Sequence, residues 1–316
     1  MKENFDKARN LIDQSQRILL TMHERMDGDD GGSVLALAKH LESKGKNVTC
    51  AIRQGVPQAL RFLPGSHKIL DDITHEKFDL IIACGCSNRK RCGSEKIMSL
   101  GAPLINIDHH PDNENFGKIN IVDPNKSSVA ELVYDMFQHH KWPIDKDIAT
   151  CLLTGIVTDT GSFMHSNTQN STLMAAGELL KKGARLQSIL ENTYKNKTPK
   201  TLKAWGQALS NLHYDQNRKI IYSVIDQQDL ASLGALPKNA FEGLAETLNT
   251  YPEAKFAMFL KQDGEVIKGS LRTNSLKNSD VSVLAKIFGG GGHRMAAGFS
   301  VAGKLEKDEQ GKWRVI

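Results

Sequence analysis

The sequence has few cysteines, few aromatic residues and no long apolar run, and each shortage excludes a class of protein. Only 5 of the 316 residues are cysteines, an odd and widely spaced set, so a disulfide framework is not expected. No stretch approaches the roughly 20 uncharged apolar residues that cross a bilayer, and the first twenty residues mix charged with apolar side chains. We therefore expect a cytoplasmic protein that does not enter membranes and keeps its cysteines reduced.

The composition is that of a folded chain with an uneven charge distribution. Hydrophobic residues make up 40% and charged residues 24%, which excludes disorder, and the length favours two domains. The chain carries 23 basic and 23 acidic residues through residue 190, and 18 basic against 13 acidic after it. This C-terminal surplus favours an anionic partner, such as a nucleotide or a short nucleic acid, without requiring one.

Apolar runs of strand character alternate with helical periodicity in the N-terminal half. Such runs stand at 17–22, 47–53, 80–84 and 104–108, and a helical pattern at 34–41 joins the first two into a βαβ unit. We expect an α/β fold with a parallel sheet and helices on both faces. Ligands of such sheets bind at the carboxyl ends of the strands.

A lysine-rich change in composition separates this half from the C-terminal part. We interpret residues 186–212 as a charged helical linker between an N-terminal domain at 1–185 and a C-terminal domain at 213–316. Strand-like and helical runs alternate in the last segment as well, which predicts a smaller α/β domain.

Residues that bind metals follow the first predicted strand. His23, Asp27 and Asp29 lie within seven residues, and a mixture of imidazole and carboxylate groups suits Mn²⁺ or Mg²⁺. A solvated loop with a helix-capping aspartate would explain Asp29 or Asp30 alone, but it would not explain the histidine.

A second group follows the strand at 104–108. Asp108, His109 and His110 stand there, and adjacent histidines point in different directions, so one can bind a metal while the other faces a substrate. Asp159, after a predicted helix, offers another carboxylate, or it caps the following turn. Several carboxylates with imidazoles are typical of two-metal hydrolases.

The C-terminal part contains two candidates for phosphate binding. Gly290, Gly291 and Gly292 belong to a run of four glycines before His293, which would offer backbone N–H groups and an imidazole to a phosphate. Arg272 ends a predicted strand, and its guanidinium matches phosphate geometry. A flexible hairpin and a surface arginine are the alternatives.

Together these motifs resemble the DHH phosphoesterase family, named for the motif that stands here as Asp108-His109-His110. Segments 23–33, 155–161 and 289–298 resemble its other signatures, and the resemblance runs through nearly the whole chain. Length and the glycine-rich C-terminal domain are most similar to the bacterial nano-RNase subgroup, which degrades very short oligoribonucleotides and dephosphorylates pAp. RecJ-type exonucleases carry extra domains for which this chain has no room.

The resemblance implies a Mn²⁺-dependent hydrolase in which a DHH catalytic domain precedes a DHH-associated substrate-binding domain. It implies two ions, the first held by His23 and Asp27 and the second by Asp29, His109 and Asp159. His110 would contact the scissile phosphate with Asp108 in support, while Arg272 and the loop at 289–293 would grip the nucleotide across a cleft. Mg²⁺ is the alternative cation, and the sequence leaves open whether two copies form a homodimer.

One position departs from the family pattern. Gly85 stands where the resemblance implies an aspartate that bridges both metals. Without that carboxylate two dications repel each other more strongly, so one ion should bind more weakly, and Gly85→Asp should raise metal affinity. A thiolate from Cys84 or Cys86 would replace the carboxylate only if the strand twists, and Asp30 is interpreted as a helix cap.

Three functions therefore stay open. The first is hydrolysis of short oligoribonucleotides and pAp to mononucleotides. The second is phosphodiester hydrolysis of cyclic or linear dinucleotides. The third is nucleotide binding by a relative whose catalysis is impaired by Gly85.

Overall fold

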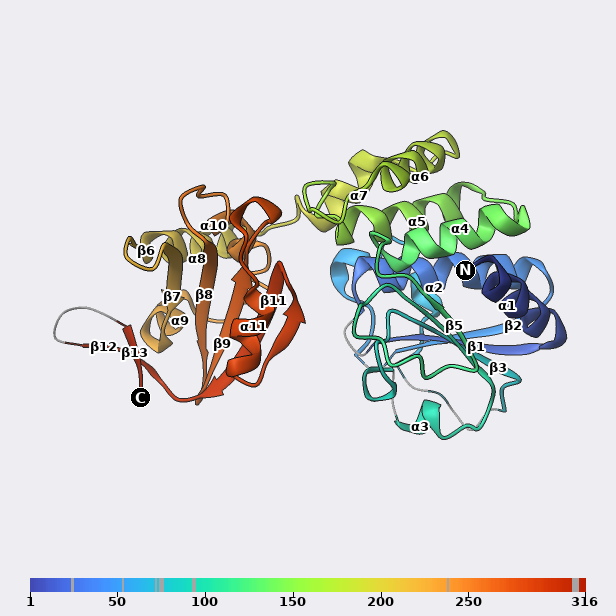
Figure 1. Cartoon of the computed structure of the whole chain (residues 1–316), viewed down its shortest axis with the longest axis horizontal. Coiled ribbons are helices and arrows are strands. Elements are labelled where there is room, and N and C mark those ends of the chain that lie inside the picture. Colours follow the sequence, from blue (N-terminus) through green and yellow to red (C-terminus); the bar gives the residue numbers. More distant parts are fainter. Residues whose placement is uncertain are drawn as a thin grey trace. The chain divides into compact units, whose positions relative to one another are not determined.

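The computed structural model (Figure 1) divides into two compact units, Met1–Asn196 and Lys197–Ile316. It describes residues 1–23, 26–52, 54–71, 73, 77–92, 95–237, 239–308 and 313–316. The first unit is built on a parallel sheet with strand order β2-β1-β3-β4-β5. Its strands are β1 (Arg17–Met22), β2 (Asn47–Ala51), β3 (Leu80–Cys84), β4 (Leu104–Asp108) and β5 (Ile119–Val122).

The central strands explain the apolar runs in the sequence. Every residue of β3 and β4 is buried, and β1 is buried beyond Arg17, because a parallel sheet is covered on both faces. Sequence patterns did not predict β5, a half-buried edge strand of 4 residues that pairs with β4. Arg53, which ends the run expected at 47–53, lies outside the described residues.

Helices cover one face of this sheet in a thick layer, and the opposite face carries the short helix α3 (Glu95–Met98) with loop segments. The thick layer consists of α1 (Lys2–Gln14), α2 (Gly28–Ser43), α4 (Val129–His140) and α5 (Lys146–Asp159), with α6 (Asn170–Lys181) and α7 (Leu186–Thr193) packed on it. The expected parallel α/β fold is confirmed.

Helices α2 and α5 approach each other closely at Gly32. A Cβ atom at this position would lie 2.2 Å from the carbonyl oxygen of Cys151 in α5, so any side chain would collide with backbone. This close approach brings the first turn of α2 and the last turn of α5 together at the carboxyl edge of the sheet.

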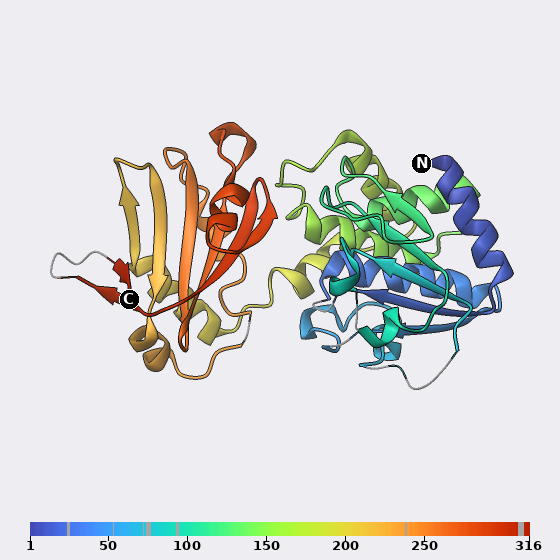
Figure 2. The ribbon, with the colours of Figure 1, turned by 60° about the horizontal axis from the view of Figure 1, so that its bottom comes forward.

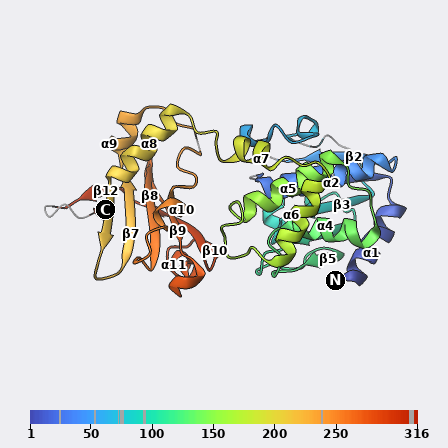
Figure 3. The same cartoon turned by 90° about the horizontal axis from the view of Figure 1, so that it is seen from above.

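The second unit is a mixed sheet with strand order β10-β11-β9-β8-β7-β6 (Figures 2 and 3). Its strands are β6 (Leu212–Asp215), β7 (Ile220–Ile225), β8 (Phe256–Asp263), β9 (Val266–Arg272), β10 (Gly291–His293) and β11 (Ala296–Ala302), followed by the hairpin of β12 (Leu305–Lys307) and β13 (Trp313–Val315). Its helices are α8 (Pro199–Ser210), α9 (Gln227–Leu233), α10 (Leu244–Leu248) and α11 (Val281–Ile287). The expected smaller C-terminal α/β domain is therefore confirmed.

The units meet in sequence inside the segment expected to be a linker. Ile189 of α7 packs in the core of the first unit, and Ala208 of α8 packs in that of the second. The exact domain limits, 1–185, 186–212 and 213–316, stay a prediction. Within the described ranges, every helix is too short or too polar to span a membrane.

Candidate metal centre

Histidines and aspartates converge at the carboxyl ends of β1 and β4. Two groups have potential ligand atoms within 4.8 Å of one another: His23, Asp27 and Asp30 in the first, and Asp29, His109 and Asp159 in the second. Carboxyl ends of parallel strands share one edge of a sheet, which is why segments so distant in sequence meet there.

The first turn of α2 supplies carboxylates to both groups. Asp27 caps the helix, because its Oδ1 accepts hydrogen bonds from the N–H groups of Asp29 at 2.9 Å and Asp30 at 3.0 Å. Asp29 is held across the helix layer, since it accepts from the N–H groups of Val129 and Ala130, both at 2.8 Å. Its carboxylate thus lies at the positive end of α4 in a fixed orientation.

Asp30 lies against His23 inside the centre. Its Oδ2 is 2.6 Å from Nε2 of His23, whereas Asp27 Oδ2 is 3.6 Å from that nitrogen. Burial disfavours the charged imidazole, but the carboxylates of Asp30 and Asp27 outweigh it and raise the pKa of His23 to about 10. The interpretation of Asp30 as the helix cap is wrong, because Asp27 takes that role.

The motif after β4 is organised around Asp108, whose side chain is fully buried. Its Oδ1 accepts from the His109 N–H at 2.8 Å and lies 2.7 Å from Nδ1 of His110, while Asn113 donates to its Oδ2 at 2.5 Å. Burial lowers the pKa of His110, but Asp108 outweighs this effect and raises it overall. Asp108 therefore orients His110 and favours its protonated form.

His109 is oriented from the other side of the centre. Its Nδ1 is 3.2 Å from the carbonyl oxygen of Lys126, and its Nε2 is 3.6 Å from Oδ2 of Asp159. A carbonyl only accepts, so Nδ1 carries a proton and Nε2 is the nitrogen that faces Asp159. In the neutral imidazole this tautomer presents the lone pair of Nε2 to a cation.

Glu131 fixes the segment that orients His109. Its buried carboxylate accepts from the Lys126 ammonium at 3.0 Å and from the Ser127 N–H at 3.1 Å. Ser128 caps this helix, because its hydroxyl oxygen accepts a hydrogen bond from the Glu131 N–H at 3.1 Å. The sequence did not reveal that Glu131 fixes this segment, because further donors to its carboxylate come from α6.

Negative charge is concentrated at this centre. The ion pairs described for its carboxylates are all with histidines. Burial, followed by the charge of Asp27, raises the pKa of Asp159 to about 8, and burial, followed by Asp159, raises that of Asp29. Divalent cations would replace these protons, so the imidazole and carboxylate set fits metal ions chemically.

The cysteines beside Gly85 do not extend this set. Cys84 and Cys86 are fully buried, and burial raises the pKa of both thiols well above the usual range. They are therefore buried, protonated thiols, and a thiol in that form binds metals poorly.

A third group of possible ligands joins two helices away from the sheet edge. Asp6 Oδ1 is 2.8 Å from Nε2 of His139, and Nε2 of His140 is 3.1 Å from the Phe5 carbonyl oxygen. These contacts tie the end of α4 to α1, and they occupy the nitrogen and oxygen atoms that a cation would need.

Arg272 and His293 lie on one face of the sheet in the second unit. Arg272 pairs with Ala296 in β11, and Ala296 pairs with His293 in β10, so the three side chains form one row. Nε of Arg272 donates to Glu246, and its Nη1 donates to the Leu271 carbonyl oxygen at 2.9 Å. A small residue thus separates two groups that can bind an anion.

The glycine run forms part of the sheet edge. The Gly290 N–H donates to the Ala285 carbonyl oxygen at 2.9 Å, so the expectation of free N–H groups is wrong at this residue. Gly291 and Gly292 belong to β10, which is exposed at the edge. Their role in substrate binding stays a prediction.

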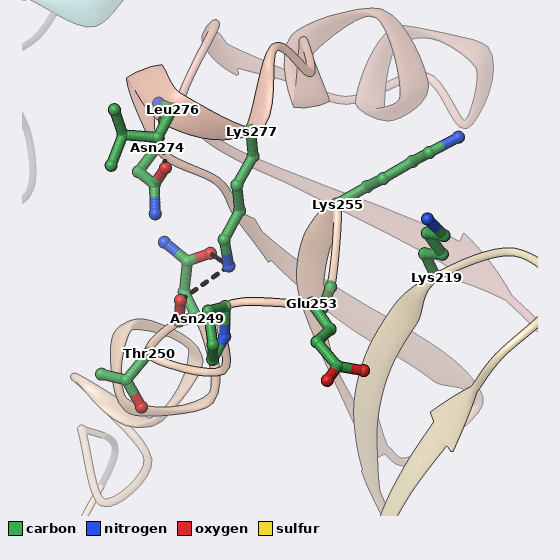
Figure 4. Close-up of a pocket in the computed structure, with 10 residues that line it drawn as sticks. Lys219, Asn249, Thr250, Glu253, Lys255, Asn274, Leu276 and Lys277 are labelled. Atoms are coloured by element: carbon green, nitrogen blue, oxygen red, sulfur yellow. Dashed lines mark hydrogen bonds between the residues drawn. The ribbon is translucent and has the colours of Figure 1, made fainter.

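A basic hollow of about 480 Å³ near the start of β7 and β8 was not predicted (Figure 4). Lys219 and Lys255 precede these neighbouring strands and line it. Lys277 also lines it, but its ammonium donates to the carbonyl oxygens of Asn249 at 2.8 Å and Tyr251 at 2.9 Å. The lysines come from separate segments, so no sequence motif predicts the hollow.

Comparisons with known proteins agree with this arrangement. The model of the DHH family, N-terminal domain, matches residues 17–156, and that of the DHHA1 domain matches residues 217–310. The bifunctional oligoribonuclease and PAP phosphatase NrnA of Bacillus subtilis (strain 168) is 30% identical over 98% of this chain and 96% of its own length. The chain belongs to the DHH family. Within the DHH match lie all residues of the two ligand groups except Asp159, which follows it closely.

Other relatives extend over similar lengths. NrnA of Thermus thermophilus is 31% identical over 92% of this chain and 86% of its own length. An exopolyphosphatase-related protein from Bacteroides fragilis has a solved structure with a TM-score of 0.88 at 27% identity, covering 95% of this chain and 91% of that one. Arg272 and His293 lie within the DHHA1 match of this DHH family chain.

Proposed function

We propose that this protein is a divalent-metal-dependent phosphoesterase that hydrolyses short oligoribonucleotides and pAp to mononucleotides. The convergence of two histidine and aspartate groups at one sheet edge carries the proposal. The names of the relatives from Bacillus subtilis and Thermus thermophilus support this substrate class. Mn²⁺ is the proposed cation because it accepts imidazole and carboxylate ligands together, and Mg²⁺ favours oxygen alone.

In this proposal His23 and Asp27 hold one ion, and Asp29, His109 and Asp159 hold the other. When bound, such ions lower the pKa of water and balance phosphoryl charge. The Asp108 carboxylate beside Nδ1 of His110 raises the pKa of that imidazole and so favours the form that can donate a hydrogen bond to the scissile phosphate.

The second unit supplies the proposed substrate contacts. Arg272 and His293 lie on the same sheet face, separated by Ala296, and both can bind phosphate oxygens. Arg272 is paired with Glu246, so substrate phosphate would have to exchange with that carboxylate. Gly291 and Gly292 at the sheet edge would let a ligand approach the backbone closely.

The test uses the purified full chain with Mn²⁺. It should convert pAp to AMP and phosphate and cleave a diribonucleotide to mononucleotides. Asp159→Asn removes one ligand charge without changing shape, and we expect a loss of roughly 100-fold in kcat. Asp112→Asn, at an exposed aspartate outside both ligand groups, is the control and should keep activity.

The other functions give different results in the same assay. Preferential turnover of a cyclic dinucleotide would identify a cyclic-dinucleotide phosphodiesterase. Nucleotide binding without turnover at high enzyme concentration would instead leave a nucleotide-binding protein, the alternative that Gly85 raised. Either result overturns the proposed activity.

A further inference from the structure

Asp30 is a buried carboxylate that the ligand assignments above do not use. Its residue exposure is 2%, and apart from the contact with His23 its Oδ2 has no hydrogen-bond partner. Helix capping does not explain it, because Asp27 accepts the N–H groups of the first turn. The imidazole of His23 at 2.6 Å is the one described partner of this buried oxygen, so a cation held between the two groups would compensate the buried charge.

The carboxylate of Asp30 occupies the space beside Gly85. A Cβ atom built at residue 85 would lie 1.6 Å from Oδ1 and 2.5 Å from Cγ of Asp30. Gly85 has a φ angle of +66°, and its N–H donates to the Ile107 carbonyl oxygen at 3.0 Å, so the backbone is held in place. A side chain at residue 85 and the present carboxylate of Asp30 therefore exclude each other.

We propose that Asp30 is a metal ligand, and that it supplies from α2 the carboxylate that residue 85 at the end of β3 does not. The inference rests on the proposed metal-dependent function. Coordination of a cation depends on the position and charge of the oxygen atom, and it does not depend on whether a strand or a helix carries that atom. Asp30 thus joins His23 and Asp27 as the third ligand of one site, with potential ligand atoms within 4.8 Å of one another.

The proposal reverses the expectation for Gly85→Asp. The new side chain would meet Asp30 instead of an empty site, and it would add a carboxylate at a position already crowded with negative charge. We expect this variant alone to bind Mn²⁺ no better than the natural chain and to be less stable. Removing the Asp30 carboxylate at the same time should make room for the new side chain. The backbone should accept it as well, because aspartate is among the residues that tolerate a positive φ angle.

Metal binding is the direct measurement. Titration of the full chain with Mn²⁺, with free ion followed by electron paramagnetic resonance, gives the number of bound ions and their affinities. We expect two ions in the natural chain. Asp30→Asn should lose one of them or weaken it roughly 10- to 100-fold, as expected for a lost ligand contact. Asp112→Asn removes an exposed charge and should bind as the natural chain does.

A double variant tests whether a carboxylate at residue 85 can replace the one at residue 30. Asp30→Ala combined with Gly85→Asp should recover the second ion, whereas Asp30→Ala alone should not. Circular dichroism would reveal whether Asp30→Asn folds. If it does not fold, the comparison of Asp30→Ala with and without Gly85→Asp still tests whether Asp30 is a metal ligand.

The outcomes separate the two proposals. Two ions bound with unchanged affinity in Asp30→Asn would overturn the inference and leave Asp30 as a partner of His23 only. A folded double variant that binds one ion would overturn the exchange with residue 85. If the natural chain binds no Mn²⁺, the proposed function itself fails, whatever the variants do.

Discussion

Asp27, Asp29 and Asp30 have the same functional group and three different environments. Asp27 caps α2, Asp29 reaches the first N–H groups of α4, and Asp30 lies buried beside His23. Successive residues of a helix point about 100° apart, so neighbours in the first turn face different elements. The role of each aspartate therefore depends on the direction in which its side chain points from the helix, and the residue type alone does not reveal it.

Asp108 shows how a residue can act through another. We expect Asp108→Asn to lower kcat for pAp hydrolysis roughly 10- to 100-fold, because the protonated form of His110 loses its charged partner. The neutral amide also turns a donor towards Asn113, so some stability should be lost. Steady-state kinetics with Mn²⁺ titration checks this.

The number of bound ions separates positioning from ligation in that variant. Two ions with reduced kcat would agree with a positioning role for Asp108. If the variant binds one ion fewer and regains its kcat at high Mn²⁺ concentration, the aspartate mainly holds His109 in place.

At the level of elements, the packing of α2 on α5 brings the ligands of the centre together. Gly32 allows this contact, because its missing side chain leaves room for the Cys151 carbonyl oxygen. The same approach sets Asp29 in α2 near Asp159 at the end of α5. Helix spacing thus controls the spacing of the ligands.

We expect Gly32→Ala to destabilise the chain by about 1–3 kcal/mol, since its Cβ atom would lie 2.2 Å from backbone. Gly177→Ala is the matched control, because a Cβ atom added to this α6 glycine would meet nothing within 4 Å. Alanine there should be neutral or stabilise by up to about 1 kcal/mol. Urea denaturation of both variants checks the difference, and equal effects would contradict the packing argument.

At the scale of the whole molecule, stability should depend on pH through His40. This residue is 2% exposed, and its ring stacks on Trp142 with centroids 4.2 Å apart. Burial, followed by the charge of Lys44, lowers its pKa from 6.5 to about 4. Between these values the unfolded chain binds a proton that the folded chain does not, so stability falls as the pH drops.

The expected loss from this group between pH 7 and pH 5 is about 2 kcal/mol. His40→Phe keeps an aromatic ring beside Trp142 and removes the titration, so its unfolding free energy should fall less over the same range. Denaturant unfolding at both pH values measures the difference. Identical pH slopes in the two proteins would show that His40 does not contribute.

Sequence patterns predicted the parts of this fold that depend on local chemistry. The buried strands β1, β3 and β4 appeared as apolar runs, and His23, Asp108, His109 and His110 stood directly at their ends. Edge strand β5 was missed because a half-buried strand of 4 residues leaves little pattern.

By itself, then, the sequence determined the order of chemical groups along the chain: which residue types follow which strand, and so which family of sites is available. Only the tertiary structure decided that Asp30 points at His23 instead of capping α2, and that Arg272 meets Glu246. Each of these depends on a partner contributed by a separate segment, and such contacts exist only after packing has set direction and distance.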